Sequence, residues 1–258
     1  MARSGAGAVA RHARVRRCRD PGRGPGAGGA VIAADLLAPD TRLIGAGLYL
    51  GLMLYAVWRA PWLELFSDSR RQHLVFGTVL ALFLLWLVRR DFVSGLSFHF
   101  IGMTAVTLLL DWPLAMLVGL AAQLGLLLLG RQDLAALGVN GLLLVGIPVA
   151  ITEGCALLVE RAQPRNLFVY IFCSGFFPAG LSALTCLLAG FAVLWLDGRY
   201  EMPPWLQDYL GYLWLVMFPE AFINGAVISG LVVYCPEWLE TFNRSRYLQA
   251  PWKDDEPR

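Results

Sequence analysis

The sequence predicts an all-α, polytopic integral membrane protein, a helical bundle of about seven transmembrane segments. Of its 258 residues, 57% are hydrophobic and 16% are charged, whereas a soluble domain carries about 25% charge. The mean hydropathy is +0.58. Apolar stretches follow one another along the chain, most of them close to the roughly 20 residues that a helix needs to cross a bilayer. These observations exclude an ordinary soluble domain.

The apolar stretches give the expected spans. They are Leu43–Trp58, Gln72–Val88, Phe92–Leu110, Trp112–Gly130, Leu134–Val159, Asn166–Leu196 and Tyr209–Cys235. The sixth is long enough to tilt across the bilayer or to include a re-entrant part. The connections between the stretches are short, so any chemistry is expected to take place in or at the membrane.

The two ends of the chain differ from this core. Residues 1–30 are rich in Arg, Gly, Ala and Pro and have almost no apolar periodicity, which predicts a disordered tail. A second interpretation of this tail is an over-extended start, with translation beginning near Val31. Residues 31–248 form the expected transmembrane domain, and residues 249–258 form a polar C-terminal tail.

The basic residues between the spans predict the orientation. Without the first tail, one side holds Arg59, Arg70, Arg71, Arg161, Arg165, Arg244, Arg246, Lys253 and Arg258, whereas the other holds only Arg42, Arg89, Arg90, Arg131 and Arg199. The positive-inside rule then places the N-terminus outside and the C-terminus in the cytoplasm. We therefore expect a multi-pass protein of the inner (plasma) membrane.

Few polar side chains lie inside the expected spans. His99 is the only histidine within a long apolar run, and it lies about seven residues, roughly 10 Å, below the outer face. Such a histidine is either hydrogen-bonded between helices or a ligand or relay residue. Glu220 and Asn224 share one helix face near the middle of the seventh span, where a carboxylate is functional or critical for folding. Asn140 by itself indicates a hydrogen bond between helices.

Small residues at four-residue spacing recur in the spans, including Gly47 and Gly51 in the first. Such residues allow helix backbones to approach closely. This spacing fits packing inside one bundle, and in the first helix it also fits docking of a partner subunit.

An ordered set of motifs resembles the CbiM/NikM family. The set comprises Gly95-Leu-Ser97-Phe-His99-Phe-Ile-Gly102, Trp112-Pro113-x-Ala115, Gln123, Leu137-Gly138-Val-Asn140 and Gly146-Ile147. Members of this family are the integral-membrane, substrate-binding (S) components of energy-coupling-factor cobalt and nickel transporters. The resemblance covers roughly residues 31–160 by motif, and the later part looks like an uncharacterised bacterial branch of the family.

The resemblance implies a metal site at the outer face, built from the extreme N-terminus and a histidine matching His99. Family chains open with Met-His-Ile-Pro-Asp, and the terminal amine, a backbone nitrogen and both histidines form a nitrogen-rich, nearly square-planar site for Ni(II) or Co(II). Here residues 31–35 fall at that opening, Asp35 matches the acid, and Ile32 stands where the family has a ligand histidine. Ser97 or Asn140 would orient the second ring nitrogen of His99.

The resemblance also implies the partners. The chain has no G-x-x-x-x-G-K-[ST] motif, so it would depend on cytoplasmic ATPases and on a membrane scaffold subunit. We expect docking at the connections Arg59–Arg71 and Arg161–Arg165 and at Gly47 and Gly51. The bilayer is the remaining partner. No permanently bound cofactor and no nucleic acid are expected, and Co(II) or Ni(II) would be the substrate.

Two other classes remain open at the level of sequence. One is an intramembrane enzyme that uses His99 with Glu220 or Glu153, and the other is a membrane scaffold that transports nothing. The chain has no H-E-x-x-H motif, no G-x-S-x-G motif and no carboxylates paired at i, i+4 within a span. We therefore do not expect an enzyme.

Overall fold

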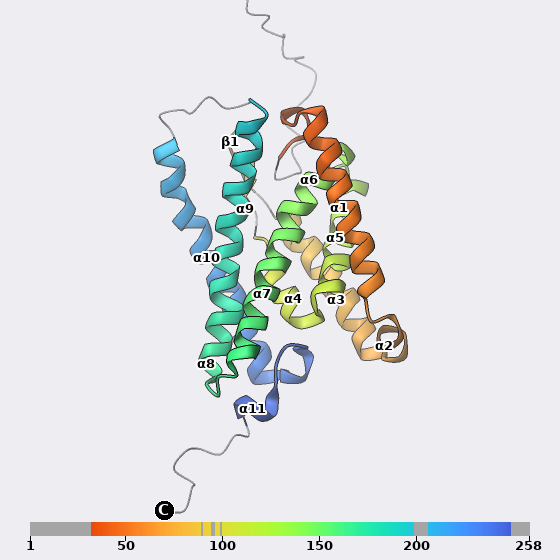
Figure 1. The fold of residues 1–258 in the computed structure, drawn as a ribbon, viewed down its shortest axis with the longest axis vertical. Coiled ribbons are helices and arrows are strands. Elements are labelled where there is room, and N and C mark those ends of the chain that lie inside the picture. The colour runs from red at the N-terminus through yellow and green to blue at the C-terminus, as the bar shows by residue number, and fades with distance from the viewer. Residues whose placement is uncertain (1–31, 89, 94–95, 99, 199–205, 249–258) are drawn as a thin grey trace, which may run out of the picture.

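The long helices of the protein lie side by side along one axis. The computed structural model describes residues 32–88, 90–93, 96–98, 100–198 and 206–248 (Figure 1). The described chain begins at the upper end of the bundle in Figure 1 and leaves it at the lower end. The predicted tails, 1–30 and 249–258, lie outside the described residues.

The first two long helices are α1, Pro39–Arg59, and α3, Ser69–Leu87, joined by the short α2, Trp62–Ser67. They coincide with the first two expected spans. A 3₁₀ turn, Ala34–Leu36, precedes α1. Proline in the first turn of α1 suits a position where no backbone donor is needed.

The third expected span, Phe92–Leu110, is not one continuous helix, and that part of the prediction is wrong. Strands β1, Arg90–Val93, and β2, Leu96–Phe98, form an antiparallel hairpin, and the short helix α4, Met103–Leu110, follows. Gly102, just before α4, has a left-handed φ of 69°. An α-helix cannot continue through a residue in that conformation.

The turn that ends α4 is equally sharp. Asp111 has a φ of 76°, and its carboxylate accepts a hydrogen bond from the backbone nitrogen of Trp112 at 2.6 Å. Helix α5, Trp112–Leu128, starts there and returns toward the upper end. The third segment therefore runs between the two ends of the bundle as a hairpin, an extended stretch and two turns of helix.

Two later spans are continuous but contain a π-helical turn. One runs from the 3₁₀ turn Leu134–Ala136 through α6, Leu137–Gly141, and the π turn Leu142–Gly146 to α7, Ile147–Ala162. The other combines α8, Leu167–Tyr170, the π turn Ile171–Phe176 and α9, Phe177–Leu196.

Each π turn leads directly into a helix that has a proline in its first turn. Pro148 and Pro178 both occupy the second residue of the helix that follows. Proline lacks the N–H and crowds the preceding turn, and a wider π turn relieves that conflict. The sixth expected span is thus a long helix, and the irregular crossing lies in the third.

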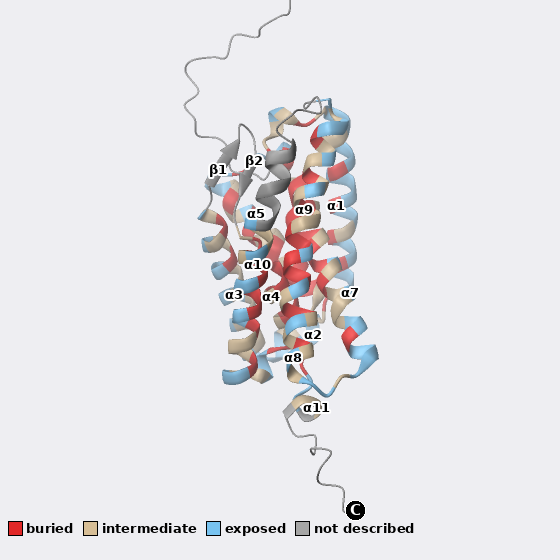
Figure 2. Cartoon of the chain, turned by 90° about the vertical axis from the view of Figure 1, so that its left-hand side faces the viewer, coloured by how far each residue is buried: buried red, intermediate tan, exposed pale blue. Residues whose placement is uncertain are grey.

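The last long helix is α10, Leu206–Tyr234, followed by the 3₁₀ turn Pro236–Trp238 and α11, Arg244–Leu248. Figure 2 shows buried residues along the inner sides of the helices and exposed residues on the outside. Large apolar side chains remain exposed there, which suits a lipid-facing surface. Among the described residues, four helices are long and apolar enough to span a membrane: Pro39–Arg59, Leu134–Ala162, Leu167–Leu196 and Leu215–Tyr234.

Helices α1 and α6 approach closely through two glycines, Gly45 and Gly138, whose packing role the sequence analysis did not predict. A Cβ atom built on Gly138 would lie 2.5 Å from the backbone nitrogen and Cα of Ala46, and one on Gly45 would lie 2.5 Å from a methyl of Val139. Around Gly47 and Gly51, by contrast, a Cβ would meet no atom within 4 Å. The Gly47/Gly51 pair therefore faces outward and does not pack this bundle.

We expect Gly138→Ala to destabilise the protein by roughly 1–3 kcal/mol, because overpacking here forces two backbones apart. Gly154→Ala is the matched control, since a Cβ there has open space. The measurement is thermal unfolding in detergent. An unchanged melting temperature for Gly138→Ala would contradict the close contact between α1 and α6.

Candidate functional site

The chain entering the bundle is fixed by Asn140 on α6. The backbone nitrogen of Ile32 donates to Asn140 Oδ1 at 3.0 Å, and Asn140 Nδ2 donates to the Ile32 carbonyl at 3.1 Å. Both residues are completely buried. The amide of Asn140 thus acts as a backbone-like partner for residue 32, an arrangement in which a side-chain amide supplies one donor and one acceptor.

The side chain of Ile32 fills an apolar site in the upper part of the bundle. The cluster around it consists of Leu37, Ala136, Val139, Leu143 and Leu194. An aliphatic side chain has no atom that can bind a metal. The position that the family resemblance gives to a ligand histidine is therefore a packed core position in this protein.

Asp197, at the end of α9, holds the start of α1. Its carboxylate accepts hydrogen bonds from the backbone nitrogen of Ala38, at 2.7 Å, and from the hydroxyl of Thr41. A carboxylate at a helix N-terminus is stabilised by the helix dipole and by the free N–H groups. The sequence analysis missed this contact, for which the only signal was an acidic residue just after an apolar span.

The other residues predicted for the metal site at the upper end are only partly described. Asp35 lies exposed in the 3₁₀ turn, and Ser97 lies in β2, where its backbone is paired with Asp91. His99 lies outside the described residues, directly after β2 and before the described Phe100. The hairpin and the turn at residues 34–36 both belong to the upper half of the bundle in Figure 1.

Glu220 and Asn224 of α10 reach into the break before α4. The carboxylate of Glu220 accepts hydrogen bonds from the backbone nitrogens of Ile101 at 2.9 Å and Gly102 at 2.8 Å. Asn224 Oδ1 accepts from the backbone nitrogen of Ala105 at 3.0 Å, and its Nδ2 donates to the Glu220 carboxylate at 2.8 Å. Both side chains are almost fully buried.

This arrangement explains a carboxylate deep in the seventh span. Backbone N–H groups that leave a helix inside a membrane need partners, because no water is available to them. Glu220 and Asn224 supply partners to the first turn of α4 and to the residue before it. In the structure, Glu220 thus supports the backbone before α4.

Trp86 on α3 holds the same stretch from the other side. Its indole nitrogen donates to the carbonyl of Ile101 at 3.0 Å, and its side chain is fully buried. Both backbone groups of Ile101, two residues after His99, are therefore fixed by side chains. The sequence analysis missed Trp86, although a buried tryptophan usually finds a partner for its N–H.

Two more polar pairs lie inside the bundle. Tyr49 donates to Gln123 Oε1 at 2.8 Å, which joins α1 to α5, and the hydroxyls of Thr104 and Thr152 lie 3.0 Å apart between α4 and α7. In the described part of the chain, no three His, Cys, Asp or Glu side chains gather as a metal would require.

The fold and these anchors define a polytopic helical membrane protein with one irregular crossing held by side chains of other helices. A model of the family "CbiM: Cobalt uptake substrate-specific transmembrane region" matches residues 32–238. The chain belongs to this family, and it is accordingly a membrane transport protein and not an enzyme. A search among curated proteins gives no match.

Two solved structures share the fold. A crystal structure of a truncated transition metal transporter is 18% identical, covers 79% of this chain and 98% of its own, and superposes with a TM-score of 0.65. A second transition metal transporter is 17% identical, with 78% and 91% coverage and a TM-score of 0.63. The fold of this chain is thus shared with solved structures of transition metal transporters.

We expect Glu220→Gln to loosen the start of α4, because an amide offers one acceptor oxygen where the carboxylate offers two. The loss of a buried hydrogen bond to a charged group costs about 1.5–3 kcal/mol. Hydrogen exchange followed by mass spectrometry should show faster exchange in peptides covering residues 100–106. Glu160→Gln, a change at an exposed carboxylate near the end of α7, serves as control. Unchanged exchange in Glu220→Gln would contradict the anchoring role.

Proposed function

We propose that the protein is the membrane-embedded substrate-binding component of an energy-coupling-factor type importer, and that it captures Co(II) or Ni(II). The observation that carries this proposal is the membership in a cobalt-uptake family together with the two-sided anchoring of Ile101, next to His99. A ligand on irregular backbone needs such support, because loose donors bind metals weakly. The transition metal transporters with the same fold add to this support.

The capture site in this proposal lies at the upper, outer end of the bundle. His99 supplies an imidazole, and a chain starting at Val31 supplies a terminal amine, whereas the backbone nitrogen of Ile32 is used by Asn140. Borderline ions such as Ni(II) and Co(II) accept such nitrogen donors. Asn140 contributes by holding Ile32. Because the amide of Asn140 is used there, Ser97 is the better candidate to orient the ring of His99. Asp35 is a further candidate donor.

The proposed orientation has seven crossings, with the N-terminus outside and the C-terminus in the cytoplasm. Basic residues of the described part support it by their position. The lower end carries Arg59, Arg70, Arg71, Arg161, Arg165, Arg244 and Arg246, whereas the upper end carries Arg42, Arg90 and Arg131. An excess of arginine marks the cytoplasmic side. With a cytoplasmic side defined in this way, we propose that the protein lies in the inner membrane.

A scaffold subunit and cytoplasmic ATPases complete the proposed transporter. The outward face of α1 supports a docking role for Gly47 and Gly51, since a partner helix could approach there without meeting side chains of this bundle. The connections Arg59–Arg71 and Arg161–Arg165 lie at the end where cytoplasmic subunits would bind. The carboxylate of Glu220, in turn, is occupied by backbone contacts and is not free to serve as a catalytic base.

Metal binding is tested by calorimetry on a chain that starts at position 31. We expect Ni(II) or Co(II) to bind at micromolar metal, and we expect His99→Ala to abolish the heat signal. His73→Ala is the matched control, because His73 is exposed near the lower end of α3. Absence of binding by the unaltered chain would remove the metal-uptake proposal.

Restoring the missing ligand gives an independent result. Ile32→His places an imidazole at the position where the family has one, so we expect tighter Ni(II) binding together with a lower melting temperature from the disturbed apolar cluster. Ile32→Val alters only the packing and should leave metal affinity unchanged. Equal affinity in both variants would contradict a site next to residue 32.

Partner docking is tested by co-purification. We expect Gly47→Leu and Gly51→Leu to lower the yield of a co-expressed scaffold subunit with its ATPases, while the isolated protein keeps its melting temperature because both positions have open space. Gly154→Leu, at an equally open glycine of α7, is the control. Undiminished co-purification would show that the partner binds elsewhere.

A further inference from the structure

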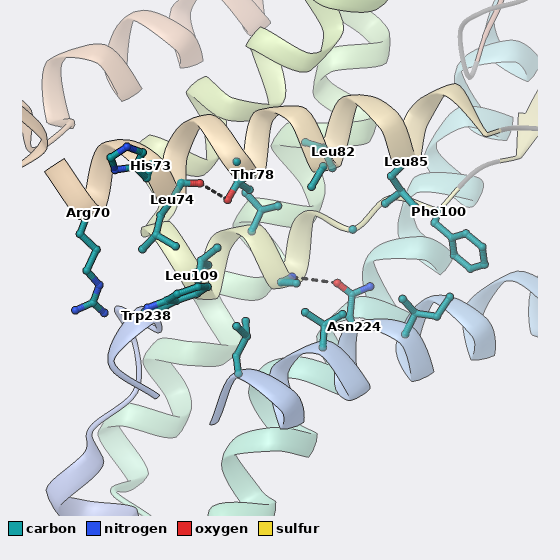
Figure 3. A pocket seen from close by; sticks show the side chains of 18 residues that line it. Arg70, His73, Leu74, Thr78, Leu82, Leu85, Phe100, Leu109, Asn224 and Trp238 are labelled. Atoms are coloured by element: carbon teal, nitrogen blue, oxygen red, sulfur yellow. Dashed lines mark hydrogen bonds between the residues drawn. The ribbon is translucent and has the colours of Figure 1, made fainter. Parts of the chain in front are cut away.

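A deep groove runs between α3 and α10, with α4 as its floor (Figure 3). Its volume is about 810 Å³. Along α3 it extends from Arg70 to Leu85, which at 1.5 Å per residue is roughly 22 Å. This length is close to the depth of one bilayer leaflet with its headgroup region, about half of roughly 40–45 Å.

The walls of the groove are apolar. The polar side chains along it satisfy their hydrogen bonds within the protein: Thr78 donates to the carbonyl of Leu74 at 2.6 Å, and Asn224 is bonded to Ala105 and Glu220. The remaining inner wall is built from residues such as Leu82, Val106 and Val227. A polar solute would find no partner there, whereas a hydrocarbon chain would bury apolar surface.

Charge is confined to the lower mouth of the groove. Arg70 and His73 lie there on α3, opposite Trp238, as Figure 3 shows. Arg70 donates to the carbonyl of Glu237 at 2.9 Å, and its guanidinium lies 3.9 Å from the Glu237 carboxylate. Its side chain is still half exposed, and a guanidinium has five N–H donors, so donors remain for an anion.

We propose that this groove binds an anionic phospholipid of the leaflet at the lower end, with one acyl chain between α3 and α10 and its headgroup phosphate at Arg70 and His73. Apolar walls, the length of one leaflet, and an arginine and a histidine at headgroup depth together define this ligand. Tryptophan at the mouth suits the level of the membrane interface. Basic pockets between transmembrane helices are known to select anionic headgroups.

The groove lies away from the proposed capture site and from Gly47 and Gly51, and it shares Arg70 with the connection Arg59–Arg71. Figure 2 places α3 and α1, which carries Gly47 and Gly51, at opposite edges of the bundle. The groove opens at the lower end, whereas residues 32–37 lie at the upper end. A bound lipid would contact α3, α10 and α4 together. It would therefore stabilise the stretch around Ile101 that Glu220 and Trp86 anchor.

Native mass spectrometry of the purified full chain tests this site. The probes are palmitoyl-oleoyl phosphatidylglycerol and the corresponding phosphatidylcholine, added in equal amounts. We expect one phosphatidylglycerol molecule to be retained by the wild type. Gly77→Leu should abolish this retention, because Gly77 lines the groove and a Cβ there meets no atom within 4 Å. Gly154→Leu, at an open glycine outside the groove, should retain the lipid.

A charge variant separates the headgroup from the acyl chain. Arg70→Gln should keep a lipid bound but lower the preference for phosphatidylglycerol about fivefold, which corresponds to about 1 kcal/mol for a basic residue near the surface. Ala81→Phe, on the same wall, replaces Gly77→Leu if that variant does not fold. Nickel binding should be unchanged in all of these groove variants. Failure of the lipid proposal is therefore distinguishable from failure of the transport proposal.

Two results would overturn the lipid site. One is equal retention of phosphatidylglycerol by the wild type and by a folded groove-filling variant. The other is a loss of scaffold co-purification in Gly77→Leu with lipid retention unchanged, which would identify the groove as a protein-docking surface.

Discussion

The structure depends on one interaction, the contact of the Glu220 carboxylate with the backbone nitrogens of Ile101 and Gly102. A polypeptide that leaves helical geometry inside a bilayer exposes N–H groups that hydrocarbon cannot satisfy, and each such group costs several kcal/mol. Glu220 satisfies two of them and Asn224 a third, and Trp86 satisfies the carbonyl of Ile101. Without these side chains the third crossing would have to be helical, and the hairpin of β1 and β2 would not form where it does.

Irregular backbone is held by the same physical means at a second place. Asn140 pairs with the donor and the acceptor of residue 32, as Glu220 and Trp86 together do for residue 101. Both segments precede a helix and both flank the proposed capture site, one carrying the proposed terminal amine and the other carrying His99. Buried amides and carboxylates therefore fix the backbone on either side of that site. In the proposed transporter, the affinity for the metal would depend on these backbone contacts as well as on the ligands themselves.

Much of the helical framework could be predicted from the sequence, because membrane helices need long apolar runs and the bilayer sets their length. The same reasoning failed for Phe92–Leu110, since the run is uncharged throughout and long enough to cross a bilayer, and the turn at Gly102 was not anticipated. For Glu220 and Asn224, the sequence showed the unusual position inside a span. It did not show their partners, because every residue type except proline has a backbone N–H. The packing role of Gly45 and Gly138 could not be predicted, because their contact joins separate helices.

The most direct test is solid-state NMR on the protein in lipid bilayers, with dipolar recoupling between the side-chain carboxyl carbon of Glu220 and the backbone nitrogens of Ile101 and Gly102. The structure predicts a coupling to both nitrogens, in keeping with hydrogen bonds of 2.9 and 2.8 Å. In a continuous helix, these nitrogens would instead bond to the carbonyls four residues earlier, those of Ser97 and Phe98. Couplings to these carbonyls, with none to Glu220, would contradict the structure on which the capture site rests.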